Sequence, residues 1–81
     1  NPDDTRFVFT RYLGYEKPML TGNDVKEVQR VTGNPVVDGW FGLDTETYVK
    51  RFQKANGLVA DGVVGKYTVQ KMNGIWAGPT N

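Results

Sequence analysis

The sequence predicts a small all-α domain, a three-helix bundle with two glycine-rich loops and a short extended N-terminal arm. The string Asp-Gly-x-apolar-Gly occurs twice, at residues 38–42 and 61–65, and each copy is followed at the same distance by a threonine, Thr45 or Thr68. Apolar residues recur at helical spacing before, between and after the two strings. The chain is therefore expected to consist of two similar units that share the central helix.

The first segment, residues 5–13, is rich in β-branched and aromatic residues that partly alternate with polar ones. This pattern favours a short strand or an extended arm over a helix. Phe7, Phe9 and Leu13 are candidates to pack against the helices. The alternative is a linker that is ordered only by its neighbours.

The first helix is expected to begin near Asn23 or Asp24, because a short polar side chain there can cap free backbone N–H groups. It is expected to end before Gly33 and Pro35. The residues on its predicted apolar face are Val25, Val28 and Thr32.

The second helix is expected to begin after Gly42, where Asp44 and Glu46 complement the positive end of its dipole. Gly57 is a suitable C-terminal stop. The predicted apolar stripe of this second helix consists of Thr45, Tyr48, Val49 and Phe52.

The third helix is expected over residues 66–73, with Val69 and Met72 buried and a stop at Gly74. Trp76, beyond it, either folds back or is exposed. The resulting division is an N-terminal arm or linker at 1–19, the domain at 20–74 and a C-terminal tail at 75–81.

The residue types of the two loops are those that tight turns require. Aspartate accepts a hydrogen bond from the backbone one or two residues on, and glycine adopts the positive φ that other residues resist. Phe41 and Val64 are predicted to point inward, which leaves Trp40 and Val63 partly open. The residues expected to have a structural role in these loops are Asp38, Gly39, Gly42, Asp61, Gly62 and Gly65.

An apolar-glutamine pair precedes each loop, with Gln29 in the first unit and Gln53 in the second. Both glutamines fall beside core residues of their helices. Because a buried amide requires hydrogen-bond partners, we expect both side chains to bridge to backbone groups of the loops.

The composition excludes several kinds of site. The 81 residues carry a formal net charge of +1, which does not indicate a nucleic-acid or membrane partner. With no cysteine and no histidine, the chain lacks a Cys/His zinc site, a thiol nucleophile and a histidine-based triad, so we expect no metal and no cofactor. No apolar run approaches the ~20 residues that span a bilayer. The carboxylates fall in turns and helix starts, so an autonomous enzyme is not expected.

The start of the chain, Asn-Pro-Asp-Asp at residues 1–4, is not a signal peptide. A start without methionine suggests a piece of a longer protein. Its cellular address would then be encoded elsewhere.

These residues resemble a known family, the peptidoglycan-binding domains appended to bacterial and phage cell-wall hydrolases. The resemblance covers roughly residues 20–74. Departures from the family pattern are Thr32, where leucine is usual, Tyr48, where alanine is preferred, and a short segment between Thr32 and Val37. The matching residues are Gly22, Asp24, Val25, Val28, Gln29, residues 38–42, Thr45, Val49, Phe52, Gln53, Gly57, Leu58, residues 61–65 and Thr68.

The resemblance implies a non-catalytic module that binds peptidoglycan and anchors a linked hydrolase, such as an amidase, a peptidase or a muramidase, to the wall. Such a monomeric module would belong to an endolysin or autolysin, secreted by a bacterium or encoded by a phage, and would act outside the cell or in the wall. One alternative is a module that docks on its own catalytic domain or regulates it, and another is a structural spacer. The fold also resembles the pro-domain of matrix metalloproteinases, whose inhibitory cysteine is absent here.

A peptidoglycan site needs flat aromatic rings, amide or hydroxyl groups and a cation. Trp40 is the first aromatic candidate, with a role as a rim residue as the alternative. Core packing is the alternative for Tyr48, and a solvated helix face for Arg51. The principal candidate ligand-binding residues are Trp40, Tyr67, Arg51, Tyr48, Asn34 and Asn56, and Trp76 and Lys66 are further aromatic and polar candidates.

Overall fold

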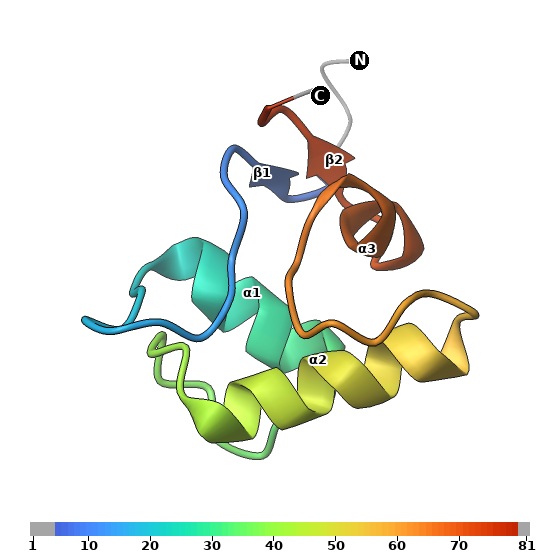
Figure 1. The fold of residues 1–81 in the computed structure, drawn as a ribbon. Coiled ribbons are helices and arrows are strands. Elements are labelled where there is room, and N and C mark those ends of the chain that lie inside the picture. Colours follow the sequence, from blue (N-terminus) through green and yellow to red (C-terminus); the bar gives the residue numbers. More distant parts are fainter. Residues whose placement is uncertain (1–4, 80–81) are drawn as a thin grey trace.

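The computed structural model describes residues 5–79, which form three helices and one pair of short strands (Figure 1). The outermost parts of the predicted arm and tail, residues 1–4 and 80–81, lie outside the described residues. None of the helices in the described part is long and apolar enough to cross a bilayer. The elements are β1 (Val8–Phe9), α1 (Asn23–Val31), α2 (Leu43–Ala55), α3 (Lys66–Lys71) and β2 (Ile75–Trp76).

The helix α1 begins at Asn23, as predicted, and its N-cap residue is Gly22, with φ 145°, which has no side chain to cap the helix. Oδ1 of Asp24 accepts the backbone N–H of Val25 at 2.9 Å, so the predicted polar acceptor for a free N–H group is present one residue into the helix. The Asp24 carboxylate also accepts hydrogen bonds from Arg11, which lies on the N-terminal arm. The sequence pattern around a helix start does not contain this distant partner.

The helices α2 and α3 each end two residues before a residue with positive φ. The helix α2 stops at Ala55, and Gly57 has φ 73° two residues later. The helix α3 ends at Lys71, two residues before the predicted end, because Asn73 turns into the left-handed region with φ 62°. Asparagine tolerates this conformation better than most residues with a Cβ.

The two strands join the beginning and the end of the described chain. They pair in parallel, with Val8 opposite Ile75 and Phe9 opposite Trp76. The backbone N–H of Ala77 extends the pairing by donating to the carbonyl oxygen of Phe9 at 2.7 Å. The extended conformation predicted for residues 5–13 is therefore present at β1, and the tail folds back along it.

One apolar core connects all parts of the molecule. Phe9 and Leu13, both from the N-terminal arm, are completely buried in it. Leu13 also forms two backbone hydrogen bonds with Val64, of 3.2 and 2.7 Å, which fasten the arm to the second loop. The buried apolar residues are Phe9, Leu13, Val25, Val28, Phe41, Val49, Val64, Val69 and Met72.

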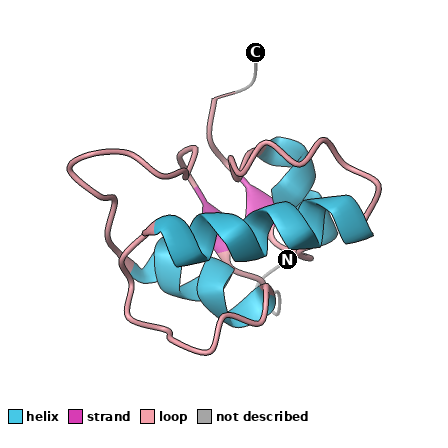
Figure 2. Cartoon of the chain, turned by 60° about the horizontal axis from the view of Figure 1, so that its bottom comes forward, coloured by secondary structure: helices cyan, strands magenta, loops and turns pink. Residues whose placement is uncertain are grey.

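The helices α1 and α2 pack directly against each other, and Figures 1 and 2 show them next to each other. The helix α3 lies beside β2, near the strand pair (Figure 1).

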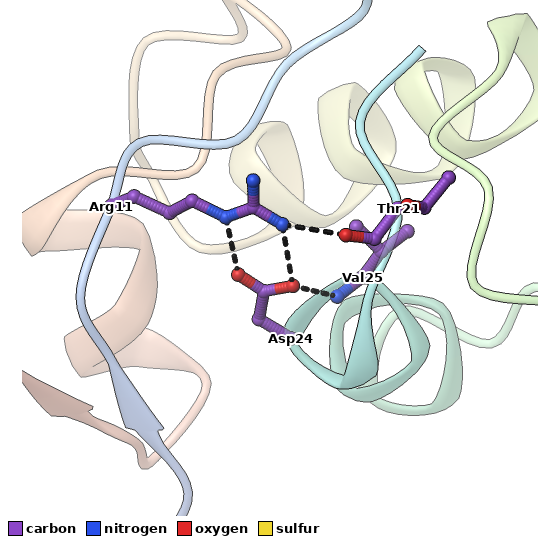
Figure 3. A network of polar contacts seen from close by, with 4 residues as sticks. All are labelled: Arg11, Thr21, Asp24 and Val25. Atoms are coloured by element: carbon purple, nitrogen blue, oxygen red, sulfur yellow. Dashed lines mark hydrogen bonds and ion pairs between the residues drawn. The ribbon is translucent and has the colours of Figure 1, made fainter.

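An ion pair holds the arm to the start of α1 (Figure 3). The Arg11 guanidinium donates from Nε to Oδ2 of Asp24 at 2.8 Å, and from one terminal nitrogen to Oδ1 at 3.1 Å. The same terminal nitrogen donates to the carbonyl oxygen of Thr21 at 2.7 Å. The hydrogen bonds from Arg11 lower the pKa of Asp24 below its ordinary value, and those to Asp24 raise the pKa of Arg11. The pair is thus charged throughout the neutral range.

This ion pair predicts an acid-dependent loss of stability. Because the folded pKa of Asp24 lies below the unfolded value, its contribution is complete above about pH 4 and is lost as the pH falls through the folded pKa. We expect Arg11→Gln to lower the free energy of unfolding at neutral pH by up to about 1 kcal/mol, since Arg11 is partly exposed. Urea unfolding at pH 7 and at about pH 2.5 measures this, and the gap between parent and variant should narrow in acid. An undiminished gap at low pH would contradict the assignment, and Asp24→Asn should behave like Arg11→Gln.

Candidate functional site

The first loop is held by a buried glutamine. The Nε2 group of Gln29 donates to Oδ1 of Asp38, to the carbonyl oxygen of Trp40 and to Oγ1 of Thr45, at 3.0 Å each. Its Oε1 accepts the backbone N–H of Gly39 at 3.0 Å. We call this set the first glutamine fork.

The second loop repeats this arrangement atom for atom. The Nε2 group of Gln53 donates to Oδ1 of Asp61 at 3.0 Å, to the carbonyl oxygen of Val63 at 2.9 Å and to Oγ1 of Thr68 at 3.1 Å. Its Oε1 accepts the backbone N–H of Gly62 at 2.9 Å. In this second glutamine fork, as in the first, the predicted bridge from the amide to the loop backbone is confirmed.

The loop aspartates serve the turns. In each loop, Oδ1 of the aspartate also accepts a backbone N–H two residues on, from Trp40 to Asp38 at 3.0 Å and from Val63 to Asp61 at 2.9 Å. The Trp40 N–H, followed by the Gln29 amide, lowers the pKa of Asp38 below its ordinary value. These carboxylates therefore support the loops.

The glycines of the loops occupy two different conformations. Gly39 and Gly62 have φ 81° and 76°, in the left-handed region as predicted. Gly42 and Gly65 are extended and are the N-caps of α2 and α3. A Cβ on Gly65 would lie 3.0 Å from the Tyr12 ring, so this glycine lets the ring lie against the backbone.

The direction of the side chains in the loops also follows the prediction. Phe41 and Val64 are completely buried. Trp40 and Val63 point outward and are 54% and 41% exposed. Each loop thus contributes one residue to the core and one to the surface.

A pocket opens beside each glutamine fork. The first pocket, of about 450 Å³, lies by the first fork and has Met19, Val36, Trp40, Leu43 and Asp44 in its walls. The second pocket, of about 580 Å³, lies by the second fork, and its walls include Tyr12, Leu58, Val59, Val63, Lys66 and Tyr67.

The structure divides the predicted ligand-binding residues between different places. Trp40 and Asn34 line the first pocket, and Tyr67 lines the second. Tyr48 and Arg51 line neither pocket, and the Arg51 guanidinium lies over the Tyr48 ring at 5.3 Å from its centroid. The six candidates therefore do not converge on one site.

The two asparagines use their amides within the fold. Asn34 is only 8% exposed, and its Nδ2 donates to Oγ1 of Thr45 while its Oδ1 accepts the N–H of Val36. The Nδ2 of Asn56 donates to the carbonyl oxygen of Phe52 at the end of α2, at 2.8 Å. These bonds leave the asparagine side chains less available to a ligand than the exposed aromatic residues.

One aromatic wall of the second pocket, Tyr12, is absent from the candidates that the sequence suggested. Tyr12 comes from the arm and reaches the pocket because its neighbour Leu13 pairs with Val64. Its ring packs on Trp76, 5.2 Å between centroids, and the Trp76 Nε1 donates to the carbonyl oxygen of Pro79. No local sequence signal announces this contact. Lys66, a further polar candidate from the sequence, lines the second pocket next to Tyr67.

No group of three acidic side chains within residues 5–79 is arranged to hold a metal ion. The site consists instead of aromatic and apolar walls on a hydrogen-bonded floor. This arrangement is suited to binding.

Comparison with known proteins identifies the family. The model of the family described as "Putative peptidoglycan binding domain" matches residues 21–72, which is more than half of the chain. The chain belongs to this family. The resemblance seen in the sequence is thereby confirmed. The chain is similar to the zinc D-Ala-D-Ala carboxypeptidase of Streptomyces albus G, with 42% identity over 59 residues, 64% of this chain and 23% of that protein.

A second relative is the N-acetylmuramoyl-L-alanine amidase CwlL of Bacillus licheniformis. Its identity is 32% over 68 residues, which cover 70% of this chain and 19% of the amidase. The chain thus spans about a fifth of the length of either relative. The similarity to these hydrolases is confined to that part of each.

The loop conformations predict the effect of a side chain at Gly39 or Gly62. A Cβ on Gly62 would meet Cγ of Glu46 at 2.9 Å, in addition to the strain of a positive φ. Valine at either glycine should lower the free energy of unfolding by about 1 to 3 kcal/mol, as measured by thermal or urea unfolding. Gly14→Ala is the control, since Gly14 is outside the left-handed region and its Cβ would make an ordinary contact. Stabilities equal to that of the control would remove the argument from backbone strain.

The glutamine forks predict that removal of a buried amide lowers the free energy of unfolding more than removal of an exposed one. Gln53→Leu removes the partner of the buried Gly62 N–H and of the Thr68 hydroxyl, so we expect a loss of about 1 to 3 kcal/mol in unfolding free energy. The same change at Gln70, an exposed residue of α3, is the matched control and should cost much less. Equal losses in urea unfolding would show that the fork does not hold the second loop.

Proposed function

We propose that this domain is a non-catalytic module that binds peptidoglycan and keeps a linked cell-wall hydrolase on its polymeric substrate. The observation that carries the proposal is the pair of open pockets with an exposed aromatic ring in each. Trp40 is 54% exposed in the first pocket and Tyr67 is 69% exposed in the second. Exposed rings on rigid supports are suited to the flat faces of sugars and peptide bonds.

The comparisons support this proposal at the level of the family. The family description is one of binding, and two relatives carry the names of a D-Ala-D-Ala carboxypeptidase and an N-acetylmuramoyl-L-alanine amidase. We infer that this domain acts outside the cell or in the wall, as a monomer attached to a catalytic domain.

The proposed mechanism is an increase in effective concentration. A weak site on a repetitive polymer keeps the attached enzyme close to many equivalent bonds without altering the chemical step. Trp40 and Tyr67 are the principal contacts in this proposal. Arg51, with Tyr48 beneath it, is a secondary contact on the α2 surface, and the two asparagines support the loops that present the rings.

A second candidate function is docking on the domain's own catalytic partner. The apolar rim of the first pocket favours this reading, because Val36 and Leu43 are 58% and 60% exposed and Met19 lies beside them in the wall. Exposed apolar groups of this kind are common at protein interfaces. A pull-down of the isolated domain with purified sacculi separates the two functions, since a docking module alone does not sediment with the wall.

The proposal predicts that Trp40 contributes to wall binding. Trp40→Ala should weaken binding to sacculi about tenfold, a loss of ~1.4 kcal/mol, and Trp40→Phe should retain part of the affinity. Arg51→Ala should have a smaller effect that salt reduces further, because an exposed charge is screened.

Val37→Ala is the control, because Val37 is also exposed and apolar but lines neither pocket. Sedimentation of the domain with increasing amounts of sacculi measures all four variants. A folded Trp40→Ala domain that binds as well as the parent would remove the first pocket from the wall-binding surface. Failure of the parent domain to sediment would reject the proposed function itself.

A further inference from the structure

The two pockets are built on equivalent backbone positions. In the first unit the Phe41 N–H donates to the carbonyl oxygen of Leu20, and in the second the Val64 N–H donates to that of Leu13. Phe41 and Val64 hold the same place in their loops, so Leu20 and Leu13 are equivalent as well. The residues just before these leucines therefore occupy corresponding walls.

Equivalent positions carry different chemistry in the two pockets. Counted back from the fork threonines Thr45 and Thr68, the first pocket has a leucine and an aspartate where the second has a lysine and a tyrosine. The corresponding pairs are Met19 and Tyr12, Leu43 and Lys66, and Asp44 and Tyr67.

This difference changes the charge that each pocket presents. Among the described residues, those that line the first pocket include two carboxylates, Asp38 and Asp44, and no cationic side chain. The second is lined by one carboxylate, Asp61, and by the Lys66 ammonium. An anionic ligand is therefore repelled by the first pocket and has a cation available in the second.

The cation of the second pocket is open to a ligand. Within residues 5–79 the Lys66 ammonium forms no ion pair, and it lies 6.0 Å from the centroid of the Tyr67 ring. Oδ1 of Asp61 is occupied by the Gln53 amide and the Val63 N–H. Because Asp61 is directed to the loop in this way, Lys66 is the charged group best placed to receive a carboxylate.

The remaining walls are apolar and aromatic. Leu58, Val59 and Val63 offer aliphatic surface on which methyl groups can pack, and the Tyr12 and Tyr67 rings offer flat faces. The Tyr12 ring is fixed between the Gly65 backbone and Trp76, so this wall is formed before a ligand arrives. A preformed wall reduces the entropy cost of binding.

On the basis of the proposed function, we propose that the second pocket binds the stem-peptide part of peptidoglycan, as a short alanine-containing peptide with a free carboxylate. Lys66 pairs with the carboxylate, the aliphatic residues receive alanine methyl groups, and the tyrosine rings cover the peptide bonds. A neutral sugar ring would gain no charge pairing from Lys66. The second pocket thus selects the peptide, and the first pocket, with Trp40, is left to neutral parts of the polymer.

The test titrates the isolated domain with three soluble probes, and NMR signals report the binding of each. They are a synthetic peptide that ends in alanine with a free carboxylate, the same peptide as its C-terminal amide, and a neutral oligosaccharide of N-acetylglucosamine. The free carboxylate should shift the signals of Lys66 and Tyr67, and the amide should bind about fivefold to tenfold more weakly.

Substitutions then identify the cation. Lys66→Gln should weaken binding of the free carboxylate about tenfold and leave binding of the amide nearly unchanged. Lys71→Gln is the matched control, because Lys71 is an exposed lysine of the same helix that does not line the pocket. Circular dichroism verifies that each variant is folded. Both are expected to fold, because Lys66 and Lys71 are exposed.

The outcomes separate this inference from the proposed function. Unchanged signals of Lys66 and Tyr67 at millimolar peptide, or equal peptide affinity of Lys66→Gln and the parent, would overturn the peptide assignment. So would a neutral oligosaccharide that shifts the same signals and binds equally well. In each of these cases sedimentation with sacculi would still support wall binding, whereas a parent domain that binds neither sacculi nor soluble probes would reject both proposals.

Discussion

The buried amide of each unit is the interaction on which the rest of the domain depends. A glutamine side chain in a core must satisfy two N–H donors and one carbonyl acceptor, and it does so here with groups of a single loop and the following helix. Each fork therefore determines where its loop lies. Once the loop is closed, one of its two middle residues enters the core and the other faces solvent, as Phe41 and Trp40 do. The pockets are a consequence of this requirement for hydrogen bonds.

The N-terminal arm completes the domain that the forks organise. Its backbone pairs with the second loop at Leu13, and its Arg11 side chain holds the start of α1 through Asp24. These two contacts connect the arm to both units, so the arm is part of the same core as the helices. The arm also supplies the Tyr12 ring, without which the second pocket would lack one aromatic wall.

Duplication of the framework with divergence of the surface explains how one small domain offers two kinds of pocket. The fork residues are the same in both units because their hydrogen bonds require those side chains. The positions that face the pockets have no such constraint, so Leu43 and Lys66 can differ while the backbone beneath them stays alike. Binding chemistry thus resides in side chains placed on a shared support.

The sequence by itself determined the features that depend on neighbouring residues. Helix spacing predicted α1 and α2, the repeated string predicted the loops, and the glycine φ values at Gly39 and Gly62 follow from residue type. The bridging amides were also predictable, because Gln29 and Gln53 recur at nearly constant spacing before the loops. Only the tertiary structure decided which distant residues meet. The pairing of Leu13 with Val64, the capture of Asp24 by Arg11 and the separation of Trp40 from Tyr67 depend on how the whole chain packs. Local conformational preferences act over a few residues, whereas these contacts form only when a common core brings segments of the chain together.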